Sequence, residues 1–138
     1  MSKHRLLIIE DDQHIANLVC RVAEEMDFDV RTTCDFMEIS SLYDEFKPQL
    51  VVLDIIMPDM DGFEVLNFLH RRNSSTRVII VSGQPDYRPM AERMAEGLEL
   101  AIVATVAKPF RLAEFRKILE DIKHSLPASD GRSASVAA

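Results

Sequence analysis

Short, continuous apolar runs alternate along the chain with stretches in which apolar residues recur every three or four positions. The run at 6–9 contains only leucine and isoleucine, which is typical of a strand that is covered on both faces of a sheet. Downstream of it, Ile15, Leu18, Val19 and Val22 have the spacing of one face of a helix. The pattern repeats and predicts five strands, each followed by an amphipathic helix. The strands are expected at 6–9, 28–32, 50–53, 77–81 and 101–105.

Five strand–helix units in succession predict an α/β domain. Parallel strands joined by helices form a sheet with helices on both faces, and the ligands of such sheets bind beyond the carboxyl ends of the strands. Local signals place some helix boundaries. Pro48 closes the second helix, and Asp61 with Glu64 resembles a capping box at the start of the third. Pro85 and Pro89 are expected to delay the start of the fourth helix.

The regular pattern ends well before the end of the chain. Residues 1–124 are interpreted as one domain. A chain of 138 residues has the length of a single domain. The 14 residues at 125–138 include four serines and four alanines and have no apolar periodicity. We expect them to form a disordered tail.

Composition and charge exclude two classes of partner. The chain has 23 acidic and 16 basic residues, a net charge of −7, and would repel the phosphate backbone of nucleic acid. Its apolar runs are far shorter than the roughly 18 residues of a membrane span, and the N-terminus does not resemble a secretory signal. We therefore expect a cytoplasmic protein without membrane insertion. Cys20 and Cys34 are interpreted as free thiols, with a single disulfide left open.

Charged or hydroxyl side chains follow four of the five predicted strands. In chain order they are Glu10, Asp11, Asp12, Asp54, Ser82 and Lys108. We predict that Asp11, Asp12 and Asp54 form a carboxylate cluster, which needs a proton or a cation to be stable. Carboxylate oxygens suit Mg²⁺ or Mn²⁺ better than zinc. A carboxylate beside such an ion can form an aspartyl phosphate, and Lys108 and Ser82 can bind the phosphoryl oxygens.

The order of these motifs resembles the receiver domain of response regulators, the phosphoacceptor component of two-component signal transduction. The resemblance spans residues 5–124 and rests on four segments: LLIIEDD at 6–12, LVVLDIIMPDMDG at 50–62, VIIVSG at 78–83 and KPF at 108–110. It implies a flavodoxin-like, doubly wound, five-stranded parallel sheet with strand order 2-1-3-4-5. It also implies that the protein regulates a downstream protein effector and is not an enzyme acting on other substrates.

The resemblance implies a role for each site residue. Asp54 would accept a phosphoryl group from a phosphohistidine of a histidine kinase or phosphotransfer protein, and Ser82 and Lys108 would contact it. Asp12 would bind Mg²⁺ directly and Asp11 directly or through water. The backbone carbonyl of Ile56 would complete the metal site, and the Lys108–Pro109 peptide would be cis. At Thr105, where the family often carries an aromatic residue that responds to phosphorylation, this chain has no ring.

Other interpretations remain open. Taken alone, Glu10, Asp11 and Asp12 are better explained as acids at a helix N-terminus; Asp54 and Lys108 at matching strand ends favour the metal site. A Mg²⁺-dependent phosphohydrolase with an aspartyl nucleophile is the main alternative function, and a flavin-binding module is another. The chain is either a stand-alone receiver or a part of a larger regulator, and the sequence does not separate the two.

Overall fold

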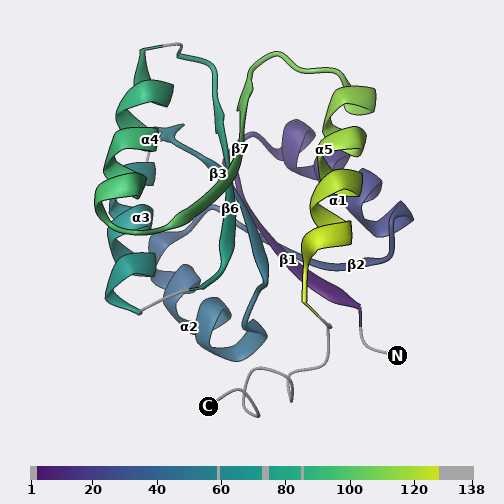
Figure 1. The fold of residues 1–138 in the computed structure, drawn as a ribbon, viewed down its shortest axis with the longest axis horizontal. Helices are drawn as coiled ribbons and strands as arrows, with labels where there is room; N and C mark the ends of the chain where they lie inside the picture. The colour runs from purple at the N-terminus through teal and green to yellow at the C-terminus, as the bar shows by residue number, and fades with distance from the viewer. Residues whose placement is uncertain (1–2, 59, 73–74, 85, 128–138) are drawn as a thin grey trace.

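A five-stranded parallel sheet forms the centre of the molecule (Figure 1). The computed structural model describes residues 3–58, 60–72, 75–84 and 86–127. The strands of the sheet are β1 (His4–Ile9), β2 (Phe28–Thr33), β3 (Leu50–Asp54), β6 (Arg77–Ser82) and β7 (Ala101–Ala107). Their order is β2-β1-β3-β6-β7. This confirms the predicted order 2-1-3-4-5, because β6 and β7 are the fourth and fifth strands of this sheet.

Helices cover both faces of the sheet. They are α1 (Gln13–Glu25), α2 (Phe36–Phe46), α3 (Gly62–Arg71), α4 (Tyr87–Gly97) and α5 (Leu112–Ser125). Figure 1 shows α1 and α5 on one side and α2, α3 and α4 on the other. Successive strand residues point to opposite faces, so Leu6 and Ile8 join the core under α1 and α5 while Leu7 and Ile9 join the other core. Two buried faces explain the continuous apolar runs.

A small antiparallel hairpin, formed by β4 (Ile56–Met57) and β5 (Met60–Asp61), follows β3. The sequence did not predict it, because two residues per strand are too few to show a period. The hairpin returns the chain to the end of β3, where the Gly62 N–H donates to the Ile55 carbonyl at 3.0 Å. A Cβ atom on Gly62 would lie 2.6 Å from the Ile55 Cα atom. Only glycine allows this close approach of two backbones.

The helix boundaries agree with the local signals except at one proline. Asp61 is the N-cap of α3, and its side chain accepts from the Phe63 N–H. Helix α4 begins at Tyr87 and contains Pro89 in its first turn, so the expectation that Pro89 delays this helix was wrong. A proline in the first helical turn removes no helical hydrogen bond, because the N–H groups there have no partner within the helix. Pro85 lies outside the described residues.

Two further expectations concern the thiols and the C-terminal segment. Cys20 and Cys34 are both free, as interpreted from the sequence. Helix α5 extends to Ser125, the first residue of the predicted tail. Residues 128–138 of that tail lie outside the described residues. Among the helices that the structure describes, none has both the length and the apolar character that a bilayer crossing requires.

Candidate functional site

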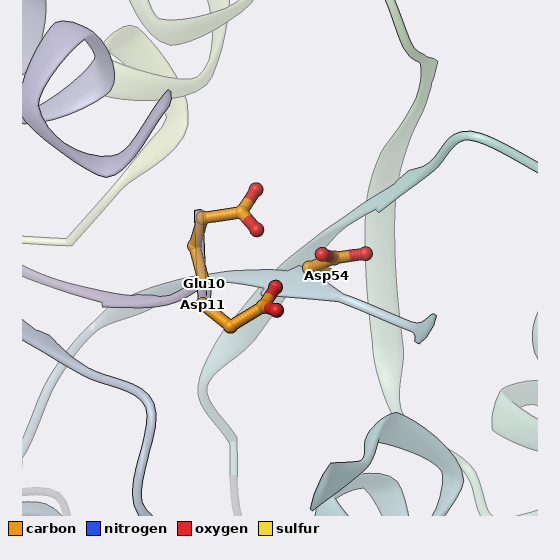
Figure 2. Close-up of side chains that lie close together, drawn as sticks. All are labelled: Glu10, Asp11 and Asp54. Carbon is orange, nitrogen blue, oxygen red and sulfur yellow. The ribbon is translucent and has the colours of Figure 1, made fainter. Parts of the chain in front are cut away.

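Three carboxylates from two strand ends meet at the carboxyl edge of the sheet. Glu10 and Asp11 follow β1, and Asp54 is the last residue of β3. Each contributes a carboxylate oxygen to a group whose members all lie within 4.8 Å of one another, and Figure 2 shows the three side chains side by side. Asp54 is 3% exposed and Glu10 is 7% exposed, whereas Asp11 is exposed. The site is therefore a pair of buried acids with a third acid at its opening.

Lys108 lies between the two buried acids. Its Nζ atom is 2.8 Å from Glu10 Oε1 and 3.0 Å from Asp54 Oδ2. Lys108 follows β7, and its backbone N–H donates to the Ser82 carbonyl at 2.9 Å. The peptide bond between Lys108 and Pro109 is cis, as the resemblance implied. One ammonium group thus offsets part of the negative charge that the buried carboxylates bring together.

The surroundings shift the pKa values of Glu10 and Lys108. The pKa of Glu10 is raised to about 7, first by burial and then by the neighbouring Asp54, while Lys108 opposes the change. Burial by itself lowers the pKa of Lys108, but hydrogen bonds to Glu10 and Asp54 and their charges outweigh it, so this pKa lies above its ordinary value. Lys108 is therefore charged at neutral pH, whereas Glu10 is only partly ionised unless another cation joins the site.

The metal-free protein is expected to lose stability as the pH rises from about 4.5 to about 7. In this window the folded protein keeps the Glu10 proton while the unfolded chain releases it, so rising pH favours unfolding. The loss attributable to Glu10 is about 2–3 kcal/mol. Urea unfolding at several pH values in a chelator measures it. Glu10→Gln protein provides the control, and an equally steep slope in that variant would contradict the assignment.

Asp12 is not part of the carboxylate group, although the sequence predicted it as a direct metal ligand. Its Oδ1 atom accepts from the His14 N–H at 3.0 Å and the Ile15 N–H at 3.2 Å, so Asp12 is the N-cap of α1. Glu10 takes the expected place beside Asp11 and Asp54. The helix-capping interpretation of these acids is thus correct for Asp12, and the metal-site interpretation fits the two residues before it.

Strand alternation contains the signal that identifies Glu10. Side chains with even numbers in β1 and β3, such as Ile8 and Val52, join the core under α1 and α5. Glu10 and Asp54 continue these two series by one step beyond the apolar run, and a two-residue period places them on the same face. Lys108 likewise follows Val106, which lies in the same core. Extending the period past each strand end would have selected these three residues.

The remaining predicted residues occupy different positions around the site. The Ile56 N–H donates to Asp54 Oδ1 at 3.2 Å, which places the backbone of Ile56 directly beside the site. The buried Ser82 hydroxyl bonds both to the carbonyl and to the N–H of Gln84, each at 3.0 Å. Thr105 lies within β7, opposite Ile80 of β6, and is half-buried.

Comparison with known proteins identifies the family. The family model of the response regulator receiver domain matches residues 6–120. The chain belongs to this family. Chemotaxis protein CheY of Listeria monocytogenes is 31% identical over 117 residues, which cover 84% of this chain and 95% of CheY. Receiver domains are signalling domains of two-component systems, and membership favours this interpretation over the phosphohydrolase and flavin-binding alternatives.

Further relatives agree with this assignment. The solved structure of a response regulator from Colwellia psychrerythraea is 28% identical, has a TM-score of 0.79, and is matched over 90% of this chain and 99% of that chain. Regulatory protein VanRB of Enterococcus faecalis is 30% identical over 116 residues, and this receiver domain spans 50% of its length. The family therefore includes proteins of about this length and proteins of about twice this length.

Proposed function

We propose that this receiver domain accepts a phosphoryl group on Asp54 from a phosphohistidine of a histidine kinase or phosphotransfer protein. The observation that carries the proposal is the position of Asp54, which is buried at the end of β3, beside two other acids and 3.0 Å from the ammonium group of Lys108. A carboxylate in such a place reacts as a nucleophile, since the surrounding groups hold it in position and can neutralise the charge of the incoming group.

The contacts of Asp54 define the reaction. The Ile56 N–H holds Oδ1 and Lys108 holds Oδ2, so the carboxylate is oriented before the donor arrives. A carboxylate oxygen attacks phosphorus, the bond between phosphorus and the histidine nitrogen breaks, and the donor imidazole leaves with the bonding electron pair. Lys108 then pairs with a phosphoryl oxygen, and the Ser82 hydroxyl donates to another. The mechanism needs positioning and charge neutralisation more than acid–base chemistry.

The acidic group fits a divalent cation. Carboxylates within 4.8 Å of one another repel unless a proton or cation intervenes, and their oxygens are the ligands that Mg²⁺ and Mn²⁺ prefer. We assign Glu10, Asp11, Asp54 and the backbone carbonyl of Ile56 as the ligands. Asp12 is left out because its carboxylate caps α1. A bound ion would neutralise charge that develops on the acyl and phosphoryl oxygens.

Asp11→Asn protein is expected to bind Mg²⁺ at least roughly tenfold more weakly than the wild type, because the change removes one charged ligand. Asp12→Asn protein is the matched control. Asparagine retains the side-chain oxygen that caps α1, so this variant should bind Mg²⁺ with nearly unchanged affinity. Isothermal titration of both proteins measures the difference. A greater loss in Asp12→Asn than in Asp11→Asn would restore the assignment based on sequence alone.

The proposed function is tested by the intact mass of the protein after incubation with Mg²⁺ and acetyl phosphate. A single phosphoryl adduct is expected with Mg²⁺ and not with a chelator, and a phosphohistidine protein should produce the same adduct. Absence of an adduct under all these conditions would contradict the proposal. Continuous turnover of a phosphorylated metabolite would support the phosphohydrolase alternative instead.

The partners follow from the same chemistry. The donor carries a phosphohistidine, and the phosphorylated surface regulates a downstream protein. A net charge of −7 supports protein partners over nucleic acid. We place this exchange in the cytoplasm, which is consistent with the two free thiols.

A further inference from the structure

We propose that the ring pair of Phe63 and Tyr87 responds to phosphorylation of Asp54. Thr105, at the position where the family often carries an aromatic residue that responds in this way, has no ring. The two ring centroids are 6.3 Å apart and the planes are inclined by 60°. Phe63 belongs to the first turn of α3 and Tyr87 to the first turn of α4. The inference rests on the proposed function, because it requires that the Ser82 hydroxyl contacts the phosphoryl group.

Ser82 is connected to the start of α4 through one backbone carbonyl. The Ser82 hydroxyl donates to the Gln84 carbonyl at 3.0 Å, and the Tyr87 N–H donates to the same carbonyl at 3.1 Å. A serine hydroxyl has one proton to donate. Ser82 therefore cannot donate to a phosphoryl oxygen and to Gln84 at the same time. When Ser82 engages the phosphoryl group, the turn that leads into Tyr87 loses one of its hydrogen bonds.

The first turn of α4 is weakly held compared with the earlier helices. Asp12, Asp35 and Asp61 each cap their helix with a side-chain hydrogen bond, whereas the N-cap residue of α4, Asp86, makes none. The Arg88 Nε atom in this turn is buried and has no hydrogen-bond partner within the described part of the chain. An uncapped turn with an unsatisfied buried donor can move at low cost.

Phe63, by contrast, is held to the strand that carries Asp54. The Phe63 N–H donates to the Asp61 side chain at 2.8 Å. The preceding residue, Gly62, is packed against the backbone of Ile55, and the Ile55 N–H in turn donates to the Val81 carbonyl at 3.0 Å. The backbone that carries the Phe63 ring is therefore fixed relative to the site, whereas Tyr87 lies on the movable turn. A shift of that turn changes the distance between the rings.

The tyrosine content of the chain permits a direct test. The chain has two tyrosines and no tryptophan, so protein labelled with 3-fluorotyrosine should give two ¹⁹F resonances, which Tyr87→Phe protein assigns. With Mg²⁺ and acetyl phosphate, and with the adduct verified by mass, we expect the Tyr87 resonance to shift. Tyr43 packs against Phe68 at 5.6 Å and is the internal reference. In Phe63→Leu protein the adduct should form normally, and the shift of the Tyr87 resonance should fall to less than half of its wild-type value.

Two variants separate this inference from the proposed function. Asp54→Asn protein should show neither adduct nor shift. Ser82→Ala protein, compared at an equal fraction of adduct, should leave the Tyr87 resonance in place. An adduct without a Tyr87 shift in the wild type would overturn the ring-pair inference and leave the phosphoacceptor role standing, as would an equal shift in Ser82→Ala. Absence of the adduct in the wild type would overturn both.

Discussion

Asp54→Asn protein is expected to form no phosphoryl adduct with acetyl phosphate or with a phosphohistidine donor. The neutral amide is a poor nucleophile, and the other carboxylates of the site are differently held. Lys108 contacts Glu10 as well as Asp54, but the Asp54 carboxylate is the one held by both Lys108 and the Ile56 N–H. The variant also removes one of two facing negative charges, so it should remain folded at neutral pH. Intact mass measures the adduct, and urea unfolding verifies that the variant is folded.

Asp61→Asn protein is the matched control for this experiment. Asp61 lies on the hairpin beside Ile56, and asparagine can still accept the hydrogen bond that caps α3. This variant should form the adduct as the wild type does. An adduct that persists in Asp54→Asn would show that another residue is the phosphoacceptor.

Gly62→Ala protein is expected to lose about 3 kcal/mol of stability or more, because the added methyl group overlaps a backbone that has little room to move. The Cβ atom would lie 2.6 Å from both Cα and O of Ile55. Ile55 is fully buried and directly follows Asp54, so relief of the overlap displaces the phosphoacceptor. We expect slower formation of the adduct together with a lower urea midpoint.

Gly97→Ala protein is the control for the glycine substitution. Gly97 is the last residue of α4, and a Cβ atom there would meet nothing within 4 Å among the described residues. Alanine is favoured over glycine in a helix by up to about 1 kcal/mol, so stability should stay the same or rise. Equal losses in the two variants would show that helix propensity, and not the approach to Ile55, explains the requirement at Gly62.

The order of strands and helices could be predicted because each element carries its own local pattern. Buried strands such as 50–53 are continuous apolar runs, and α5 repeats its apolar residues at helical spacing. Right-handed connections between parallel strands restrict the sheet to a few arrangements. The hairpin of β4 and β5 could not be predicted in this way, because its strands pair over two residues each. The prediction at Pro89 was wrong because the effect of a proline depends on its position within the first turn of a helix.

The sequence by itself determined the class of fold, and it placed Asp54 and Lys108 at strand ends that the structure brings together, because these residues follow recognisable strands. Only the tertiary structure decided which of three consecutive acids join Asp54. That choice depends on where β1 ends and α1 begins: Glu10 continues the inward face of the strand, while Asp12 is needed to cap the helix. Side-chain direction at a junction is set by backbone geometry on both sides of it, which residue types alone do not specify.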